Sequence, residues 1–550
     1  MVAENSGHIT KQIFVIGGVV SSLGKGITSS SLGRLLRSRG VNVLQQKLDP
    51  YMNVDPGTMN PFQHGEVYVT EDGAETDLDL GHYERFLGTP LSQDASVSSG
   101  QIYQEVLRKE RAGGYLGECV QVIPHVTDEI KRRMRSQAGE DVDVVITEIG
   151  GTIGDIESLA FMEAARQVCQ EIGPENCMFI TVSLVPYLKA SKEFKTKPTQ
   201  QAVMLLRREG ISPDAIVLRS ELPLPKSIKD KVAAMCGVKE KGVISCPDAE
   251  NIYMVPKMLH EEGLDSFVVE RLGLKAHELE WGEWASLMDA VSHLEGSVEI
   301  AIVGKYVDLP DAYLSVVESV KAAGFGDRVD AKIRWIDADE CTSDEKIASL
   351  LKGCDGLIIP GGFGKRAIEG MLRTLKWARE NNFPALGICL GLQCMVIEYA
   401  RDVLGLEDAS STEFNPDTSN PVIATMEEQK AVIAGTKGMG HTMRLGSYPA
   451  VLKEGTKAYS LYGTKDIQER HRHRYEVNSA YKKALEDAGL TISGTSPDGE
   501  LAEFVEVTGN LFYVATQAHP EMKSRPYAPH PLFKGLVDAA LVHKKVREDK

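Results

Sequence analysis

A cysteine between two glycines is the feature of the sequence with the clearest chemical potential. Residues 387–391 read Gly-Ile-Cys-Leu-Gly, between a strand-like apolar stretch (383–388) and a helix-like apolar stretch (392–399). This is the pattern of a nucleophile elbow, in which small neighbours allow a sharp turn from strand to helix. The N–H groups and dipole of the following helix favour a thiolate. Cys389 is therefore a candidate nucleophile.

A candidate proton carrier for this cysteine lies far downstream. His519 is followed by Pro520 and Glu521, so a carboxylate two residues away could orient the imidazole. Cys389, His519 and Glu521 together predict a Cys-His-Glu triad. Taken alone, a cysteine before an apolar helix is more often a small core residue. The glycine turn Pro-Gly-Gly-Phe-Gly at 360–364 favours the catalytic interpretation, because its N–H groups could form an oxyanion hole.

A candidate phosphate-binding loop lies near the N-terminus. Residues 17–26 read Gly-Gly-Val-Val-Ser-Ser-Leu-Gly-Lys-Gly, between an apolar strand-like stretch and a helix-like stretch. Loop N–H groups and the helix N-terminus would surround phosphates, and Lys25 would neutralise the terminal one. The strict motif is not met, because five residues separate Gly18 from Gly24 and Gly26 replaces the usual Ser or Thr. A glycine-rich turn that binds no nucleotide is the alternative.

Two carboxylates are candidate ligands for magnesium, which prefers hard oxygen atoms. Glu148 closes the apolar stretch 142–147 and precedes two glycines, and Asp79 ends the acidic stretch 71–79. For Asp79 a solvated acidic loop is the alternative. The basic polar segment 195–200 could hold the phosphates of a second nucleotide, although its charge alone favours a loop that faces water.

Alternating strands and helices must position these groups. Strand-like stretches at 12–16, 41–45, 142–147 and 178–185 alternate with helix-like ones such as 28–38. This βαβ pattern predicts an α/β fold with a parallel sheet covered by helices. A second α/β pattern begins near residue 298 and contains the glycine turn, the cysteine and the histidine.

The segment between these two patterns predicts a linker. Apolar residues recur there at helical spacing, which indicates an amphipathic helix: Trp284, Leu287, Met288, Val291 and Leu294. We therefore divide the chain into a first domain (1–272), a linker (273–297), a second domain (298–542) and a charged tail (543–550).

Composition and charge limit the partners. With 550 residues, of which 42% are hydrophobic and 25% charged, the chain resembles an ordinary soluble protein of two or three domains. A formal charge of −17 argues against nucleic acid or an anionic membrane as a partner, but it permits nucleotides. Nine cysteines without a Cys-x-x-Cys pair, a polar N-terminus and the lack of a long apolar window predict a cytoplasmic location.

Together these motifs resemble the CTP synthetase family, in which an amidoligase domain precedes a class I glutamine amidotransferase domain. The resemblance covers nearly the whole chain and is carried by residues 17–26, 47–59, 63–66, 72–85, 195–200, 304–313 and 470–478. It implies two doubly wound α/β domains, an N-terminal P-loop-type parallel sheet domain and a C-terminal flavodoxin-like glutaminase domain.

The resemblance also implies a reaction. ATP phosphorylates O4 of UTP, and ammonia from glutamine displaces that phosphate to give CTP; positioning and charge neutralisation carry such phosphoryl transfers. It assigns magnesium to Asp79 and Glu148, and the phosphoryl transfer to Lys25 and Lys47. ATP would contact Ser22, Leu23, Gly24, Lys25, Gly26, Ile27, Asp79, Pro247, Asp248 and Ala249. UTP or the inhibitor CTP would contact Ser21, Asp155, Ile156, Glu157, Lys195, Thr196, Lys197, Pro198, Thr199, Gln200 and Lys231.

In the second domain the resemblance agrees with the triad predicted from the residues. His519 would be general base and acid, and Glu521 would orient it. Glutamine and its oxyanion would contact Gly362, Leu390, Gly391, Leu392, Gln393, Glu413 and Arg474. A carboxylate for the ammonium of glutamine and an arginine for its carboxylate make electrostatic sense. Free ammonia in water would mostly become ammonium, and the resemblance implies a closed passage lined by Pro61, His64 and Val67.

The resemblance further implies activation by GTP, a homotetramer, and filaments. Some positions depart from the family pattern. Gly114 stands where an aspartate is common, in a lid resembling one involved in GTP activation, and Ala518, Met522 and His441 alter the surroundings of the glutamine site. Two other functions are alternatives. An amidoligase acting on the carboxylate of a tetrapyrrole would lack the 195–200 and 55–79 segments, and a nucleotide-binding scaffold would have no use for Cys389.

Overall fold

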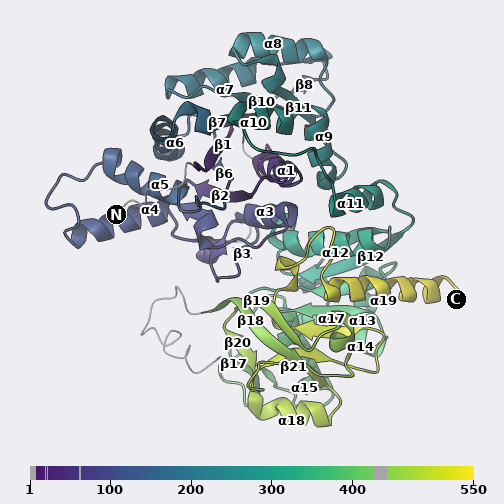
Figure 1. Ribbon diagram of the computed structural model, residues 1–550. Coiled ribbons are helices and arrows are strands. Elements are labelled where there is room, and N and C mark those ends of the chain that lie inside the picture. Colours follow the sequence, from purple (N-terminus) through teal and green to yellow (C-terminus); the bar gives the residue numbers. More distant parts are fainter. Residues whose placement is uncertain (1–7, 19, 21–22, 61–63, 426–442, 550) are drawn as a thin grey trace. The chain divides into compact units, whose positions relative to one another are not determined.

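The computed structural model describes residues 8–18, 20, 23–60, 64–425 and 443–549. It divides into two compact units (Figure 1). Unit 1 consists of Met1–Thr58 and Asp79–Met288, and unit 2 consists of Met59–Leu78 and Asp289–Lys550. Both units are α/β, which confirms the predicted fold class.

Unit 1 is built on a seven-stranded parallel sheet with the strand order β11-β10-β7-β1-β6-β2-β5. The strands are β1 (Lys11–Gly17), β2 (Val43–Asp49), β5 (Ser96–Ser98), β6 (Val144–Ile149), β7 (Cys177–Leu184), β10 (Ala215–Ser220) and β11 (Val243–Pro247). In β1, Ile13 and Val15 pack into one apolar cluster, and Phe14 and Ile16 pack into another. Both faces of the sheet are thus covered, as continuous apolar strands require.

Helices cover these faces. They are α1 (Lys25–Arg37), α3 (Asp79–Leu87), α4 (Ser99–Arg111), α5 (Thr127–Met134), α6 (Leu159–Ile172), α7 (Lys197–Arg208), α8 (Lys226–Cys236), α9 (Val255–Glu261) and α10 (Leu264–Leu272), followed by α11 (Glu283–Ser292). The small strands β8 (Tyr187–Leu188) and β9 (Glu193–Phe194) form a hairpin. Strands β1, β6 and β2 are neighbours, so their carboxyl ends bring Lys25, Glu148 and Lys47 to one edge of the sheet, where ligands bind in open α/β folds.

Helix α11 lies within the predicted linker. Its Trp284 is buried, contacts the rings of Phe86 and Tyr253, and donates its indole N–H to the Tyr253 carbonyl over 3.1 Å. The first turns of this helix therefore pack on unit 1.

Unit 2 is built on a nine-stranded mixed sheet with the order β13-β12-β14-β15-β23-β22-β21-β18-β19. Its strands are β12 (Ser297–Gly304), β13 (Asp330–Asp337), β14 (Gly356–Ile359), β15 (Ala385–Ile388), β18 (Arg444–Leu452), β19 (Asp466–His473), β21 (Thr491–Thr495), β22 (Ala502–Glu506) and β23 (Tyr513–Thr516). A smaller sheet contains β16 (Ser410–Ser411), β17 (Pro421–Thr425) and β20 (Tyr475–Val477).

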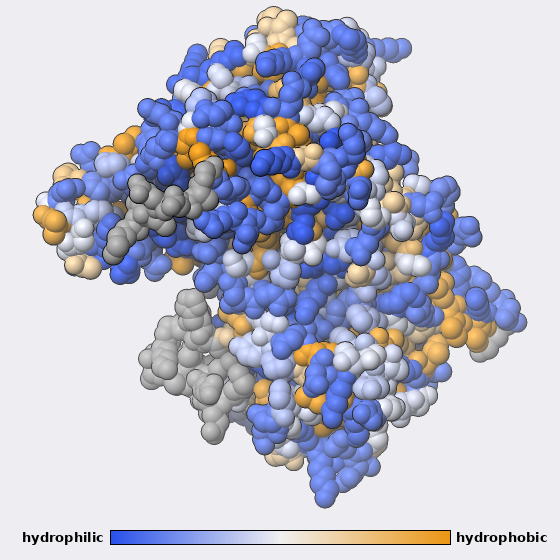
Figure 2. Space-filling view, in the orientation of Figure 1, coloured by the Kyte–Doolittle hydropathy of each residue, from blue (hydrophilic) through white to orange (hydrophobic). Residues whose placement is uncertain are grey.

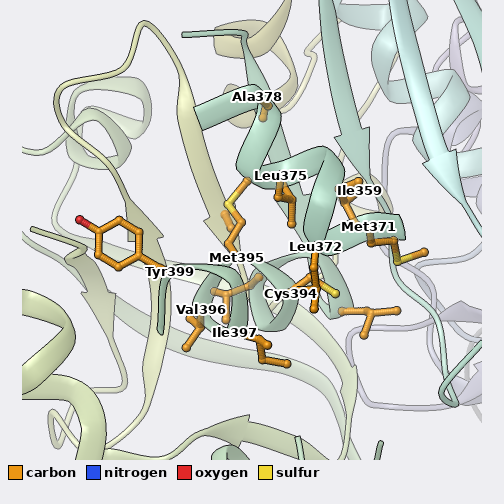
Figure 3. Close-up of a cluster of buried hydrophobic side chains, with 14 of the residues drawn as sticks. Ile359, Met371, Leu372, Leu375, Ala378, Cys394, Met395, Val396, Ile397 and Tyr399 are labelled. Atoms are coloured by element: carbon orange, nitrogen blue, oxygen red, sulfur yellow. The ribbon is translucent and has the colours of Figure 1, made fainter. Parts of the chain in front are cut away.

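The helices of unit 2 are α12 (Leu314–Gly326), α13 (Asp344–Leu350), α14 (Ile368–Glu380), α15 (Leu390–Asp402), α17 (Lys457–Tyr462), α18 (Ser479–Asp487) and α19 (Pro531–Glu548). Figure 3 shows the apolar core in which Met371, Leu372 and Leu375 of α14 lie near Cys394 and Met395 of α15. This packing holds the start of α15, and with it the cysteine turn, in place.

The segment Met59–Leu78 belongs to unit 2, whereas the predicted boundary at residue 272 assigned it to the first domain. Its hairpin, β3 (Tyr68–Val69) and β4 (Glu75–Thr76), meets strand β19. Arg470 is fully buried there, with Nη2 3.0 Å from Glu71 Oε1, and it donates to the Tyr68 hydroxyl and the Val69 carbonyl. Local sequence periodicity carries no information about such a pairing between distant segments.

The described residues include no helix long and apolar enough to cross a membrane. The face of the molecule in Figure 2 is mostly hydrophilic, with hydrophobic residues scattered among the hydrophilic ones.

We expect Arg470→Met to lower the free energy of unfolding of unit 2 by about 3 kcal/mol, because it leaves the part-buried Glu71 without its cation. Arg328→Met is the matched control: Arg328 and its partner Asp289 are both about half exposed, and exposed ion pairs contribute less than about 1 kcal/mol. Urea unfolding followed by tryptophan fluorescence measures both. Equal effects of the two substitutions would contradict the structural role of Arg470.

Candidate active site

Cys389 lies at the turn between β15 and α15, with φ 53° and ψ −99°. A positive φ at a residue other than glycine is sparsely populated and often marks a functional turn. The flanking glycines make the turn feasible: a Cβ added at Gly387 would lie 2.8 Å from Gly391 C, and one at Gly391 would lie 2.2 Å from Ile359 O. The predicted elbow is present, and it requires both glycines.

His519 lies against this cysteine. Its Nδ1 is 2.7 Å from Glu521 Oε1, which leaves Nε2 for proton transfer. Nε2 is buried and has no hydrogen-bond partner among the described residues. A Cβ added at Gly361 would lie 2.8 Å from His519 Cε1 and 3.7 Å from Cys389 Cβ, so the two side chains converge beside the glycine turn. The structure brings the predicted triad together.

The electrostatics of the pair favour a charged imidazolium. Burial opposes a charge on His519, but the Glu521 carboxylate and the Cys389 thiol outweigh it and raise the pKa of His519 to about 10. An imidazolium beside a cysteine is the arrangement that supports a thiolate nucleophile.

Two further residues contact the sulfur and were missed from the sequence. Cys389 Sγ lies 3.9 Å from the Arg472 carbonyl, and Gln517 Nε2 lies 3.8 Å from Sγ. Gln517 precedes His519 by two residues, a spacing that places both side chains on the same side of an extended chain. That spacing was the available signal. The contact with the Arg472 carbonyl depends on the position of β19 beside Cys389, which local sequence patterns do not predict.

The glycine turn is held by a buried lysine that local sequence patterns do not identify. Lys305 Nζ donates to the carbonyls of Phe363, at 3.2 Å, and Gly364. Burial lowers the pKa of Lys305 to about 8, although nearby acidic groups oppose the shift. A Cβ added at Gly362 would lie 3.4 Å from Leu390 Cδ2, so the turn lies against the first residue of α15.

The remaining predicted glutamine contacts surround this turn. Glu413 accepts the Gly364 N–H at 2.7 Å, and burial raises the pKa of its carboxyl group. Arg474 interacts electrostatically with Glu413, and its Nε is buried without an acceptor among the described residues. Gln393 donates to the Tyr475 carbonyl at 3.1 Å. Gly391 and Leu392 lie buried in the first turn of α15.

In unit 1 the predicted phosphate loop leads into α1. Ser21 and Ser22 lie outside the described residues. Gly24 has φ 79° and precedes α1, and Lys25 Nζ donates to the Gly151 carbonyl at 2.6 Å. Burial lowers the pKa of Lys25, and Glu148 opposes this shift. The lysine therefore lies inside the predicted phosphate region, opposite an acidic group.

The structure explains why glycine replaces Ser or Thr at position 26. A Cβ added at Gly26 would lie 2.5 Å from Asp79 Oδ1 and 3.6 Å from Glu148 Oε2. Both predicted metal ligands thus approach the N-terminus of α1. Lys47 forms ion pairs with Asp79 and, at 3.4 Å, with Asp49.

These two carboxylates fit magnesium. Glu148 is held by the Tyr83 hydroxyl at 2.6 Å and the Ser29 hydroxyl at 3.3 Å, while Asp79 belongs to a different element. Among the described residues no group of three or more potential ligands could hold a metal. One or two carboxylates are nevertheless the usual protein share of a magnesium site, with phosphates and water completing the octahedron.

A cavity of about 190 Å³ adjoins the loop. The cavity brings together predicted ATP contacts that lie far apart in the sequence of unit 1. Its lining residues are Gly24, Ile27, Thr28, Arg219, Cys246, Asp248, Ala249, Ile252 and Val255. Arg219 fixes one wall through Asp248, at 2.7 Å, and the Pro247 carbonyl, at 3.0 Å. Leu23, just before Gly24, is buried.

The predicted UTP and CTP contacts differ more in burial than the predicted ATP contacts that line the cavity. Segment 195–200 is not the water-facing loop that charge favoured, because residues from Lys197 onward, including Pro198, form the first turn of α7. Thr199 is buried and bonds to Ser183 and Leu184, and Gln200 donates to Thr196. By contrast, the predicted contacts Asp155, Ile156, Glu157 and Lys231 are exposed, and Lys195 is half-buried.

Of the predicted passage residues, Pro61 lies outside the described residues. His64 Nε2 is 3.2 Å from Asp77 Oδ2, and Val67 is half-buried. Ala518 and Met522 are buried beside the triad, and His441 lies outside the described residues. A Cβ added at Gly114 would lie 2.6 Å from Lys109 Cγ, so a larger side chain there would require that lysine to move.

Comparison with known proteins identifies the family. Residues 11–274 match the family model "CTP synthase N-terminus", and residues 308–539 match "Glutamine amidotransferase class-I". The chain is 67% identical to the CTP synthase of Bifidobacterium longum, with 98% of each chain covered, and 60% identical to that of Acidothermus cellulolyticus, with 97% and 96% covered. The solved glutaminase domain of Trypanosoma brucei CTPS with bound acivicin is 36% identical over 45% of this chain and 94% of that one, with a TM-score of 0.42. The chain belongs to the CTP synthase family of glutamine-dependent ligases that form C–N bonds.

Proposed function

We propose that this protein converts UTP to CTP, with ATP as the phosphoryl donor and glutamine as the nitrogen donor. One observation carries the proposal. A chain that matches the family along its length holds an assembled Cys-His-Glu triad in one unit and a lysine-carboxylate phosphate site in the other.

In unit 2 the Cys389 thiolate attacks the amide carbon of glutamine. His519 Nε2 donates its proton to the departing nitrogen, so ammonia leaves and a thioester remains. His519 then takes a proton from water, whose oxygen attacks the thioester and releases glutamate and the thiolate. The N–H groups of Gly362 and Leu390 stabilise each tetrahedral oxyanion. Glu413 and Arg474 bind the ammonium and carboxylate groups of glutamine.

In unit 1 the ATP phosphates lie on the loop and the N-terminus of α1, and the adenine occupies the cavity beside Ile27 and Ala249. Asp79 and Glu148 would hold magnesium, which supplies charge neutralisation when it is bound. Lys25 and Lys47 neutralise the phosphoryl group as it passes to O4 of UTP. Ammonia then attacks C4, and phosphate leaves.

The family resemblance extends the proposal. UTP would contact Ser21, Lys231 and segment 195–200, and the inhibitor CTP would contact Asp155–Glu157 in an overlapping site. GTP would activate glutamine hydrolysis, ammonia would pass by His64 and Val67, and the protein would work in the cytoplasm as a homotetramer that can form filaments. The first domain would end near residue 272 and the second would begin near residue 298, except that the segment Met59–Leu78 belongs to unit 2.

We expect Cys389→Ala to reduce glutamine-dependent CTP formation by at least about a thousandfold, while ammonia-dependent formation stays close to that of the unchanged protein. The substitution removes the nitrogen supply and leaves unit 1 intact. Cys394→Ala is the matched control, because Cys394 lies in the apolar core on the same helix.

An absorbance assay of UTP conversion with ATP, run with glutamine and with ammonium, measures both activities. Equal loss with the two nitrogen donors would contradict the division of labour, and no conversion by the unchanged protein with either donor would refute the proposed function.

We expect Lys25→Ala to abolish CTP formation with either nitrogen donor, because phosphoryl transfer precedes amination in both cases. Lys226→Ala, which removes an exposed lysine paired with Asp230, should leave both activities unchanged. Retention of ammonia-dependent CTP formation by Lys25→Ala would show that the loop does not serve the phosphoryl transfer.

A further inference from the structure

Strand β19 carries a second set of ionisable side chains that the mechanism does not use. His471 and His473 lie on the opposite face of this strand from Arg470 and Arg472, and both are buried. They contact three more buried charged side chains from β18, β20 and β22. We call these residues the histidine cluster: Arg444, His471, His473, Glu476 and Glu503.

Hydrogen-bond directions fix the proton positions in the two rings. His473 Nδ1 is 3.2 Å from the Tyr475 carbonyl, which only accepts, so this nitrogen carries a proton. In a neutral ring, His473 Nε2 is then an acceptor, and it lies 2.9 Å from His471 Nδ1, which must donate. A neutral His471 therefore presents a bare lone pair at Nε2.

That lone pair faces a second acceptor. His471 Nε2 lies 3.7 Å from Glu503 Oε2, and this oxygen accepts no hydrogen bond from the described residues. Two buried acceptors that face each other without a proton repel. Burial strongly lowers the pKa of both histidines and raises the pKa of Glu503. The carboxyl group therefore holds such a proton more readily than the imidazole does.

Charge counting also favours the uptake of one proton by the cluster. Arg444 lies 2.7 Å from Glu503 Oε1 and 3.3 Å from Glu476 Oε1, so one cation serves two carboxylates. With both histidines neutral, the buried cluster has a net charge of −1 unless it takes up one proton. An unbalanced charge in such a place is costly.

We propose that the histidine cluster holds one proton on the facing pair His471 and Glu503, whose Nε2 and Oε2 atoms lie 3.7 Å apart, and that His471 and Glu503 in this state are positioning residues for glutamine hydrolysis. The inference rests on the proposed role of Cys389. It adds a protonation requirement that the triad itself does not contain.

The cluster reaches the reacting groups through backbone carbonyls. The Tyr475 carbonyl accepts from His473 and also from Gln393, and the Glu503 carbonyl accepts the Gln517 N–H at 2.9 Å. Gln517 in turn contacts Cys389 Sγ. Loss of the proton would place two repelling acceptors between β19 and β22, which hold the strand and loop segments around the sulfur.

Other titratable groups face the cluster and enter the pH dependence. The Tyr448 ring meets His471 edge-on at 5.6 Å, His519 acts on both histidines, and Asp498 acts on Glu503. Burial and the neighbouring Glu503 raise the pKa of Glu476 to about 8. The cluster proton is bound at low pH and is lost as the pH rises, so its contribution disappears on the alkaline side.

The test compares pH profiles of the full-length protein. We measure kcat/KM for glutamine, by glutamate release, between pH 6 and pH 10, alongside ammonia-dependent CTP formation. Glu503→Gln supplies an amide N–H to His471 without a titratable proton. We expect kcat/KM of the unchanged protein to fall at alkaline pH, and we expect this fall to shift upward by at least about one pH unit, or to vanish, in the variant. Ammonia-dependent profiles should coincide.

Glu506→Gln is the matched control, since Glu506 is buried on the same strand but accepts the N–H groups of Lys457 and Ala458. Its profile should run parallel to that of the unchanged protein. If Glu503→Gln fails to fold, as judged by lost ammonia-dependent activity, His471→Gln provides the same comparison. A variant profile parallel to that of an active unchanged protein would overturn the inference. An unchanged protein that hydrolyses no glutamine would refute the proposed function instead.

Discussion

The proposed glutamine site depends on how one strand uses its two faces and its carbonyl groups. In β19 the side chains of Arg470 and Arg472 bind Glu71 and Glu75 of the hairpin, whereas those of His471 and His473 enter the buried cluster on the other side. Between them, the Arg470 carbonyl accepts the His519 N–H at 2.7 Å, and the Arg472 carbonyl lies against Cys389 Sγ. Cys389 and His519, the proposed nucleophile and base, thus both contact this strand, and its position is fixed from both faces.

The proposed phosphate site depends on a different constraint, which is the lack of room for a side chain at position 26. The Asp79 carboxylate lies where a side chain at position 26 would be, so only glycine allows it to approach the N-terminus of α1. Lys25 and Lys47 then face Asp79, Asp49 and Glu148, and each charge depends on the others for compensation. Asp79 directly follows Leu78, the last residue of the segment that packs in unit 2. One stretch of chain therefore contributes both to the support of the proposed glutamine site and to the proposed phosphate site.

Much of the fold and of the candidate site could be predicted, because local sequence patterns determine them. The alternation of strands and helices predicted the α/β fold, and the motifs identified the family, both of which are confirmed. The Cys389 elbow is recognisable from the spacing of its glycines, and the Lys25 loop is recognisable from the order of strand, glycine-rich loop, lysine and helix. The membership of Met59–Leu78 in unit 2, the anchoring of the glycine turn by Lys305 and the histidine cluster were not predicted. Each depends on contacts between segments far apart in the sequence, for which periodicity and spacing provide no signal.

The most direct test of the central claim follows the nitrogen atom. Glutamine labelled with ¹⁵N in its amide group is supplied with UTP, ATP, magnesium and unlabelled ammonium, and the CTP formed is analysed by mass spectrometry. The account predicts that the unchanged protein forms ¹⁵N-labelled CTP and that Cys389→Ala forms only unlabelled CTP. Glutamate release by the unchanged protein without any ¹⁵N in CTP would contradict the claim that Cys389 supplies nitrogen to chemistry in the other unit.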